Sequence, residues 1–397
     1  MSSDPLIVFG AFDRHNFGDL LFPHVAEAML PGRELLFAGV AQRDLTAFGG
    51  HRVRAIASLA SEWGDRPVDV FHAGGEILTV DAWQAAVMVL PQDDVAGVIG
   101  LYGDEEAGRL AWARGYLGFD HLAAYVVPRR LFRRPGRWLF GGVGGVALDR
   151  SAARLRAEVE AELHGSDFVG VRDARTLVHL QSAGIAAHLM PDPAVMVAEL
   201  FDGRIRRHGE SGEPGAVREA FRQGYLALQF SADFGDDATL AFIAAQLDRV
   251  AAETGLGIVL FRAGAAPWHD DIEVLRRMLS RLKSRGRVFE SLDIWDICAL
   301  IAGSRGICGS SLHGRILALD YGLPRVSVAA ADGLADKQEA FIRTWDADHP
   351  SGSAGVGQIG DALRSALATG AEAGRRTATY LSALYRQRFA EVRDALD

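Results

Sequence analysis

Short, continuously apolar runs alternate with segments of helical period along most of the chain. A run of this kind, bounded by polar turns, is typical of a buried parallel strand. In the first half, strands are predicted at residues 6–11, 34–38, 68–73, 138–140, 167–171 and 188–190. In the second half, they are predicted at residues 225–230, 257–261, 288–289, 306–309 and 325–329.

Amphipathic helices are predicted between these strands. Ile294, Ile297, Cys298 and Ile301 lie at i, i+3, i+4 and i+7, so they form one apolar helix face in which the Cys298 thiol is buried. Other helices are predicted at about 20–29, 151–163, 236–254, 271–283 and 371–397. Regular alternation of strand and helix predicts the α/β class, here as two doubly wound, Rossmann-like domains that face a cleft.

The length of the chain also indicates two domains, because 397 residues are too many for one hydrophobic core. Residues 201–218 are polar, contain Gly and Pro, and show no apolar period, so they are predicted to be the linker. The expected division is an N-terminal domain at 1–205 and a C-terminal domain at 222–350. A final helix at 371–397 is expected to pack on the body of the protein.

Composition excludes several classes of function. Hydrophobic residues make up 49% of the chain and charged residues 23%, and the net charge of −9 argues against broad nucleic-acid binding. The two cysteines give neither a disulfide framework nor a zinc pattern, which fits a reducing, cytoplasmic setting. No signal peptide and no apolar stretch of membrane-spanning length is apparent. The oligomeric state is left open.

The stretch from Gly306 to Pro324 is the strongest candidate for a ligand site. It reads as a strand, a polar turn and a helix, with Ser310 as the predicted N-cap and Ser311 beside it. His313 and Arg315 then lie in the first helical turn, where unpaired N–H groups and the helix dipole favour an anion. An ordinary strand-to-helix turn with an exposed histidine is the alternative interpretation.

Two loops in the first half carry polar or glycine residues at the ends of predicted strands, where open α/β sheets bind ligands. Asn16, Gly18 and Asp19 follow the first strand, and Gly74 with Gly75 follows the run at 68–73. Asp19 would otherwise be only a helix cap, and the paired glycines only a tight turn. The G-x-G-x-x-G spacing of a dinucleotide site is absent from both loops.

Charged residues follow two further strands. Arg172 and Asp173 end the run at 167–171, where the arginine would bind an anion and the aspartate would orient it. In the alternative, Asp173 caps the next helix and Arg172 forms a surface pair. The loop after the run at 257–261 carries Arg262 and His269, which are further candidates for substrate binding.

One strongly basic cluster lies between Arg129 and Arg137, with arginines at 129, 130, 133, 134 and 137. Such a cluster attracts an anionic phosphate or a membrane surface that carries a lipid-linked substrate. A solvated loop is the alternative interpretation.

The sequence resembles the polysaccharide pyruvyl transferase family over about residues 7–345. The motifs that carry the resemblance are Asn16-Phe17-Gly18-Asp19, His72-Ala73-Gly74-Gly75, Gly170-Val171-Arg172-Asp173, Pro191-Asp192-Pro193, Trp268-His269-Asp270-Asp271, Ser310-Ser311-Leu312-His313-Gly314 and Lys337-Gln338-Glu339-Ala340-Phe341. The family's fold is similar to that of the GT-B glycosyltransferases. Its characterised members move an enolpyruvyl unit from phosphoenolpyruvate to a sugar, which gives a pyruvate ketal.

This resemblance implies a donor site, a glycan acceptor and no cofactor or metal. Phosphoenolpyruvate would bind the turn from Ser310 to Arg315 together with Arg172, His313 would be the general acid, and Asp19 would act as base or orient the sugar. The acceptor is expected to be a polysaccharide or glycan precursor, including a lipid-linked one at the inner face of the membrane. Some characterised members have arginine where this chain has Ser311, and Arg315 is the nearest replacement for that charge.

Two other functions are compatible with the same sequence. A GT-B-type glycosyltransferase would bind a nucleotide sugar and make no use of phosphoenolpyruvate. A non-catalytic glycan-binding protein of the same fold would tolerate substitution of His313 and Arg172 without loss of its partner.

Overall fold

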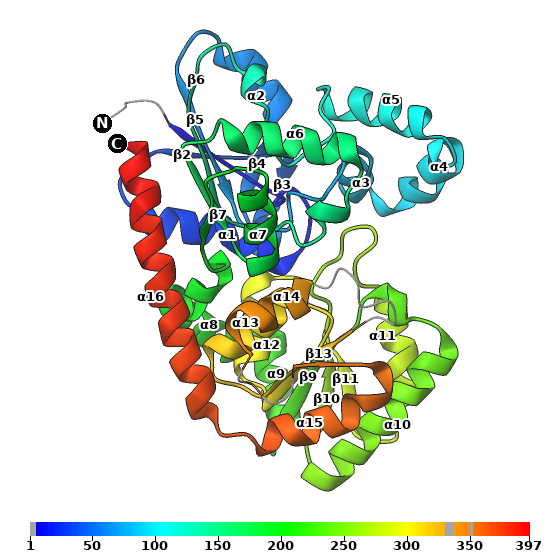
Figure 1. Ribbon diagram of the computed structural model, residues 1–397. Coiled ribbons are helices and arrows are strands. Elements are labelled where there is room, and N and C mark those ends of the chain that lie inside the picture. The colour runs from blue at the N-terminus through cyan, green and yellow to red at the C-terminus, as the bar shows by residue number, and fades with distance from the viewer. Residues whose placement is uncertain (1–4, 330–336, 348, 350–351) are drawn as a thin grey trace. The chain divides into compact units, whose positions relative to one another are not determined.

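The computed structural model describes residues 5–329, 337–347, 349 and 352–397 (Figure 1). Contacts within the chain divide it into two compact units. Unit 1 comprises Met1–Pro193 and Leu384–Asp397, and unit 2 comprises Ala194–Ala383. Each unit is an α/β fold built on its own sheet, which confirms the predicted fold class.

The sheet of unit 1 has the strand order β3-β4-β2-β1-β5-β6-β7-β8. Its strands pair in parallel except β3, which pairs antiparallel with β4 at one edge. β1 is completely buried, as its apolar run predicts. The strands are β1 (Leu6–Phe9), β2 (Leu35–Gly39), β3 (Arg43–Asp44), β4 (Arg52–Ala55), β5 (Val68–Ala73), β6 (Pro135–Val143), β7 (Phe168–Val171) and β8 (His188–Leu189).

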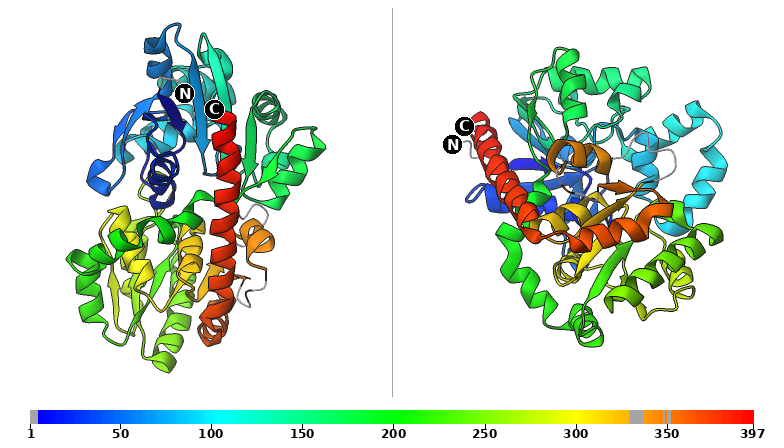
Figure 2. Two further views of the ribbon diagram at one scale, coloured as in Figure 1. Left: turned by 90° about the vertical axis from the view of Figure 1, so that its left-hand side faces the viewer. Right: turned by 60° about the horizontal axis from the view of Figure 1, so that its bottom comes forward.

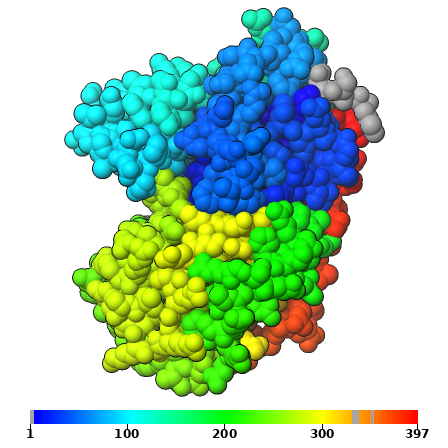
Figure 3. Space-filling view, turned by 180° about the vertical axis from the view of Figure 1, so that it is seen from behind, coloured from blue at the N-terminus to red at the C-terminus, as the bar shows by residue number. Residues whose placement is uncertain are grey.

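The helices of unit 1 include a small lobe with its own apolar cluster. Trp83, Val87, Leu90 and Val95 form this cluster, against which Trp112 packs. The lobe, cyan in Figures 1 and 3, contains α3, α4 and α5. The helices are α1 (Phe17–Met29), α2 (Ile56–Trp63), α3 (Ala82–Met88), α4 (Gln92–Tyr102), α5 (Glu106–Leu117), α6 (Ala153–His164) and α7 (Ala174–Ser182).

The sheet of unit 2 is parallel throughout and has the order β11-β10-β9-β12-β13-β14. Its strands are β9 (Tyr225–Gln229), β10 (Gly257–Leu260), β11 (Gly286–Val288), β12 (Gly306–Gly309), β13 (Arg325–Val328) and β14 (Ser353–Ala354). Apolar side chains of α10, α11 and α15 pack with the strands to form one core. The helix α12 packs with α8, α9 and α13.

The helices of unit 2 are α8 (Val197–Gly209), α9 (Gly212–Ala220), α10 (Asp237–Thr254), α11 (Ile272–Leu279), α12 (Ile294–Ala302), α13 (Leu312–Asp320), α14 (Lys337–Trp345), α15 (Ile359–Ala368) and the first part of α16 (Ala371–Leu396). Cys298 is buried on α12, as predicted, and burial raises the pKa of its thiol. Among the described helices, none combines the length and hydropathy needed to cross a membrane.

The helix α16 is one uninterrupted element that begins in unit 2 and ends in unit 1 (Figure 2). In unit 1 it buries Tyr385, Phe389 and Val392 along one face. The Phe389 ring lies edge-on to Phe71 of β5, with ring centroids 5.7 Å apart. The final segment is therefore helical and packs on the body, as predicted.

The domain boundaries need correction. Residues 201–218, predicted as a linker, lie mainly in α8 and α9, and the division between units falls after Pro193 instead of near residue 205. The apolar side chains that these helices bury are few and widely spaced: Val197, Ile205, Pro214 and Val217. This sparse pattern hides their period in the sequence. Unit 2 also continues past the predicted end at 350 through α15.

Candidate functional site

Both sheets reverse their winding direction next to the loops that carry the sequence motifs. In unit 1 the chain passes from β1 to β2 on one side and later adds β5 on the other side of β1. In unit 2 it passes from β9 to β10 and later adds β12 on the other side of β9. Open α/β sheets bind ligands at the carboxyl ends of strands at such a switch point. The loops after β1, β5, β9 and β12 are therefore the candidate site segments of their units.

In unit 1, the loop after β1 holds Asp19 as a buried carboxylate. Asn16 caps α1, because its Oδ1 accepts the Gly18 N–H at 3.2 Å, so the interpretation of Asp19 as only a cap is wrong. Asp19 is 4% exposed, and its Oδ2 lies 3.8 Å from Nη2 of Arg14. A carboxylate beside one arginine at a switch point can orient a hydroxyl or accept its proton.

The two glycines after β5 allow close approach of the chain. Gly74 has φ of 65°, and a Cβ there would meet the Phe22 ring at 2.8 Å. Gly75 has φ of 84°, and a Cβ there would lie 3.7 Å from Oδ1 of Asp19. Gly74 therefore serves the packing of α1 on β5, whereas Gly75 adjoins the candidate carboxylate.

A buried polar network beside Asp19 was not predicted from the sequence. Nη1 of Arg14 donates to the Tyr125 hydroxyl at 2.5 Å, which donates to Oδ1 of Asp13 at 2.9 Å. Burial raises the pKa of both Asp13 and Tyr125. Asp13 and Arg14 belong to the polar run after β1, so the run was visible, but Tyr125 is distant in sequence and gave no signal.

Arg172 is the centre of a buried ion cluster. It is 3% exposed, and it donates to Oδ2 of Asp192 and to Oε2 of Glu76, each at 2.7 Å. Burial alone would lower the pKa of this guanidinium, but Asp192 and Glu76 raise it. Two carboxylates already neutralise the arginine, which argues against its predicted role as a ligand for phosphoenolpyruvate. Its position fits a residue that fixes the loop after β5 through Glu76.

Asp173 caps α7. Its Oδ1 accepts the Thr176 N–H, and its Oδ2 accepts the Thr176 hydroxyl, both at 2.8 Å. The alternative interpretation of Asp173 as a helix cap is therefore confirmed. The carboxylates that orient Arg172 are those of Glu76 and Asp192.

In unit 2, the turn after β12 joins neighbouring strands through Ser310. The N-cap of α13 is Ser311, which accepts the Gly314 N–H at 3.2 Å, so the predicted cap at Ser310 is wrong by one residue. Ser310 instead accepts the Ser231 N–H at 3.0 Å, and its own N–H donates to Oε1 of Gln229 at 3.0 Å. These contacts connect the carboxyl ends of β9 and β12.

His313 is the second residue of α13. It is 5% exposed and lies in the first turn of the helix, as the sequence predicts. The N-terminal turn of a helix presents unpaired N–H groups and partial positive charge, so an anion bound there would lie close to the imidazole.

Arg315 is buried and paired, which argues against its predicted role as an anion ligand. Its guanidinium, 2% exposed, donates to Oδ2 of Asp346 at 2.5 Å and to the Ser327 hydroxyl at 3.2 Å. Arg325 binds the same carboxylate through Nη2 at 2.5 Å. Burial lowers the pKa of Arg315 to about 10, although Asp346 opposes this shift. Asp346 lies far along the chain, so the turn alone gave no sign of this pairing.

The loop after β10 supplies a cation with no such partner. Within the described part of the chain, no carboxylate lies within ion-pair distance of the half-buried Arg262. Its Nε is buried and makes no hydrogen bond to the described residues. Burial lowers the pKa of this guanidinium. The same loop places Oδ1 of Asp270 2.7 Å from Nε2 of Gln229, which also bonds Ser310. Arg262 is thus the best-placed arginine for an anion at this edge.

Asp270 and His269 have different environments in this loop. Burial raises the pKa of Asp270 to about 6, although the N–H of Ala263, which donates at 2.6 Å, opposes the shift. The imidazole of His269 contacts the backbone of its own loop, since Nδ1 lies 3.0 Å from the Pro267 carbonyl oxygen. The sequence motif contains Asp270, but nothing in the pattern distinguished it from its neighbours as the buried one.

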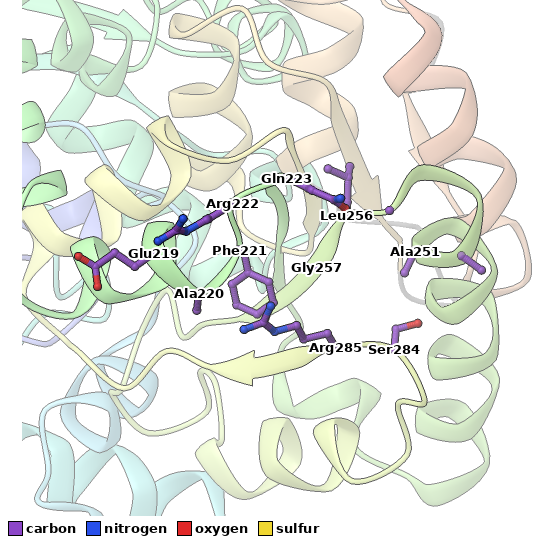
Figure 4. A pocket seen from close by; sticks show the side chains of 13 residues that line it. Glu219, Ala220, Phe221, Arg222, Gln223, Ala251, Leu256, Gly257, Ser284 and Arg285 are labelled. Atoms are coloured by element: carbon purple, nitrogen blue, oxygen red, sulfur yellow. The ribbon is translucent and has the colours of Figure 1, made fainter.

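A pocket lies at the amino ends of β9 and β10, which is the end of these strands that faces away from the candidate loops (Figure 4). Its lining includes Gly224, Gly257, Phe221 and Arg285, and the Arg285 guanidinium lies 5.1 Å from the centre of the Phe221 ring. None of the predicted site residues lines this pocket, so it is not the candidate site.

The basic cluster at Arg129–Arg137 is extensively paired within unit 1. Arg129 and Arg137 both contact Asp167, at 3.3 and 3.2 Å. Arg133 contacts Asp65 at 3.3 Å, and Arg130 lies 3.8 Å from Glu162. These acids offset much of the positive charge that a membrane surface would attract.

His72 of β5 has a structural role that leads to a first prediction. Its Nδ1 faces the Leu139 carbonyl at 3.1 Å and its Nε2 accepts the Val127 N–H at 3.0 Å, which requires a neutral ring. Burial lowers the pKa of His72 to about 3, whereas the His72 ring of the unfolded chain is protonated as the pH falls below about 6.5. Protonation therefore stabilises the unfolded state as the pH falls through this range. Between about pH 6.5 and 5, the wild type should lose about 2 kcal/mol more stability than His72→Gln. Urea unfolding of both proteins at several pH values measures the difference, and identical pH profiles would contradict it.

Comparison with known proteins agrees with the arrangement of these motifs. Residues 151–331, which include Arg172, Arg262 and the turn before α13, match the family described as polysaccharide pyruvyl transferase. That family is one of transferases. The resemblance drawn from the motifs is thereby confirmed over these residues. No protein of the curated set matches the sequence.

Solved structures show that the fold is GT-B-like. UDP-GlcNAc 2-epimerase from Neisseria meningitidis, bound to UDP-GlcNAc, matches with a TM-score of 0.56 and 12% identity, covering 98% of each chain. The epimerase from Methanocaldococcus jannaschii, in complex with UDP-GlcNAc and UDP, has a TM-score of 0.53 and 11% identity, covering 95% of this chain and 99% of that one. A putative epimerase from Listeria monocytogenes has a TM-score of 0.52 and 12% identity, covering 99% and 96%.

Proposed function

We propose that the protein is a pyruvyl transferase that moves an enolpyruvyl unit from phosphoenolpyruvate to a sugar of a polysaccharide or glycan precursor. The observation that carries this proposal is the placement of His313 in the first turn of α13, at the switch point of unit 2 and within the residues that match the family. An anion bound at this helix end would lie beside the imidazole of His313, and the reaction needs both an anion site and a proton donor.

The donor would bind unit 2. Phosphoenolpyruvate carries a phosphate and a carboxylate, so its site needs helix N–H groups together with a cation. The N-terminus of α13 would supply the N–H groups, and Arg262 would supply the positive charge. Arg315 and Arg172 are paired with Asp346 and Asp192 instead. This assignment replaces the arginines that the sequence favoured.

The chemistry would then begin with His313. Its imidazolium gives a proton to the methylene carbon of phosphoenolpyruvate, which leaves an oxocarbenium-like centre at C2. One sugar hydroxyl attacks C2 and loses its proton to a base. A second hydroxyl of the same sugar then attacks C2, the C2–O bond to phosphate breaks, and the phosphate leaves with the proton of that hydroxyl, which closes the ketal. The products are the pyruvate ketal and inorganic phosphate.

Unit 1 would bind the acceptor. Asp19 is the proposed base or orienting group for a sugar hydroxyl, and Gly75 leaves space beside it. A lipid-linked acceptor would bring the enzyme to the inner face of the membrane in the cytoplasm. In that case the arginines at 129–137 are the proposed contact, despite their pairing with acids.

One observation favours a second candidate function. The structures with the same fold bind UDP-GlcNAc, so a nucleotide-sugar enzyme such as a glycosyltransferase is the alternative. Isothermal calorimetry with phosphoenolpyruvate and with UDP-GlcNAc separates the two. Saturable binding of phosphoenolpyruvate supports pyruvyl transfer, whereas binding of UDP-GlcNAc alone supports the alternative.

Arg262→Gln is expected to weaken phosphoenolpyruvate binding about 10- to 100-fold, because it removes a charged hydrogen-bond donor of about 1.5–3 kcal/mol. Calorimetric titration measures the dissociation constant. Arg249→Gln on α10 is the matched control, since this arginine is exposed and donates to the Ala245 carbonyl of its own helix, away from the loops of the candidate site. Equal affinities of the two variants would exclude Arg262 from the donor site.

A further inference from the structure

We propose that His24, Glu27 and His51 of unit 1 bind a divalent transition-metal ion, and that Zn²⁺ fits the site best. Each residue offers one ligand atom, and these atoms lie within 4.8 Å of one another. The proposal is independent of pyruvyl transfer, because none of the three residues belongs to the candidate site.

The fold brings the ligands together from two segments. His24 and Glu27 lie three residues apart on α1, so they share one helix face. His51 lies between the short helix at Thr46–Phe48 and β4. Because these segments are separate in sequence, the sequence shows no ligand spacing and predicts no metal.

The protein fixes the His24 ring in an orientation that suits a metal. Its Nε2 lies 2.8 Å from the Gly49 carbonyl, which can only accept, so Nε2 carries the proton. In the neutral ring, Nδ1 is then the nitrogen without a proton, and it lies 3.9 Å from Oε2 of Glu27. A hydrogen bond from the second ring nitrogen to a carbonyl is the usual support of a metal-binding histidine.

Distances within the cluster are close to those of a tetrahedral site. Metal bonds of about 2.0–2.1 Å place neighbouring ligand atoms about 3.3 Å apart. Nε2 of His51 lies 3.1 Å from Oε2 of Glu27, and Nδ1 of His24 lies 3.9 Å from the same oxygen. The imidazole rings of the two histidines are 4.2 Å apart at their centres. Small side-chain rotations therefore suffice to bring all three atoms around one ion.

The donor set and its exposure indicate the kind of ion. Two imidazoles and one carboxylate suit Zn²⁺ and exclude a preference for Ca²⁺ or Mg²⁺, which take oxygen ligands. The Glu27 side chain is 49% exposed, so an ion reaches the site from solvent and a water molecule completes its coordination. Such an ion would tie α1 to the segment before β4 and stabilise unit 1 by mass action.

A second cluster, in unit 2, is a weaker candidate. His208, Asp293 and Asp296 also lie within reach of one ion. However, both oxygens of Asp296 accept hydrogen bonds, from His208 and from Ser291, and Asp293 caps α12. A metal there would have to displace all of these contacts, whereas an ion at His24, Glu27 and His51 would replace the one hydrogen bond between Nε2 of His51 and Oε2 of Glu27.

The test is a calorimetric titration of the chelator-treated full-length chain with Zn²⁺ alone. The variants Glu27→Gln and His51→Gln are expected to bind one Zn²⁺ fewer per chain, or to bind it at least about tenfold more weakly. His179→Gln is the matched control, because His179 pairs with one carboxylate, Glu160, at 3.0 Å in the same unit. Because the Glu27 side chain is exposed, Glu27→Gln is expected to leave the fold intact, so a loss of Zn²⁺ binding in it reports on the ligand. Circular dichroism checks that each variant is folded.

Co²⁺ gives a second readout, because its visible absorption reports the ligands around it. Wild type and His179→Gln should give the same spectrum, and His51→Gln should lose the bands of the site. Zn²⁺ binding that is unchanged in Glu27→Gln and His51→Gln overturns the proposal. An equal loss of Zn²⁺ binding in His179→Gln also overturns the proposal, since the loss would then not be specific to the cluster. His24 and His51 would in that case be only neighbours of the Glu27 carboxylate.

Discussion

Replacing His313 with alanine is expected to slow pyruvyl transfer by about 10²- to 10⁴-fold, the contribution of a general acid that is placed within reach of its carbon. The donor should still bind, because the N–H groups of α13 and the charge of Arg262 remain. The loss should therefore appear in kcat, whereas Arg262→Gln should affect the dissociation constant of phosphoenolpyruvate. Phosphate release in the presence of an acceptor that the wild type accepts measures the rate.

The matched control for His313 is His208→Ala. His208 lies in the same unit, is half-buried and pairs with Asp296 at 2.7 Å, but it belongs to α8 and not to the switch-point loops. It should keep the wild-type rate. A His313→Ala protein with full activity would remove the general-acid assignment, and an equal loss in both variants would point to the stability of unit 2 instead.

Asp346→Asn is expected to destabilise unit 2 by about 3–5 kcal/mol, because it leaves two buried guanidinium groups without their shared counter-charge. Asp346 is 4% exposed and bonds Arg315 at 2.5 Å and Arg325 at 2.5 and 2.9 Å. The two arginines lie on α13 and β13, so the loss should also loosen the helix that carries His313. Urea unfolding and limited proteolysis measure the effect.

Asp361→Asn provides the surface comparison for this experiment. Asp361 pairs with Arg364 on α15 in the same unit, but its side chain is 81% exposed. Exposed pairs contribute about 0–1 kcal/mol, so this variant should unfold almost as the wild type does. Similar destabilisation by both substitutions would mean that burial of the Asp346 cluster contributes little.

Most of the fold was predictable because the parallel strands are continuous apolar runs. β1, β5, β9 and β10 were each located to within about two residues, since strands that are buried on both faces leave a simple pattern. The short strands β3, β4 and β14 were missed. β3 and β14 are edge strands of two residues each, and β4, which lies between β3 and β2, alternates arginine with apolar residues and forms no continuous apolar run.

The site was predictable at the level of loops but not of individual side chains. The loops after β1, β5 and β12 do lie at switch points, because a strand followed by a polar turn and a helix has only one common arrangement in α/β sheets. The partners of the arginines were not predictable. Arg315 and Arg172 bind carboxylates that lie far along the chain, whereas Arg262 has no carboxylate within ion-pair distance among the residues that the structure describes.

The path of α16 determines the order in which the protein is completed during synthesis. Unit 2 is continuous in sequence from Ala194 to Ala383, so all of its strands are synthesised before Leu384–Asp397. Unit 1 begins first but needs that last segment, which covers Phe71 with Phe389. The earlier-made unit is therefore finished later. Until then Phe71 of β5 lacks its contact with Phe389, and apolar surface that is exposed transiently in this way is prone to aggregation.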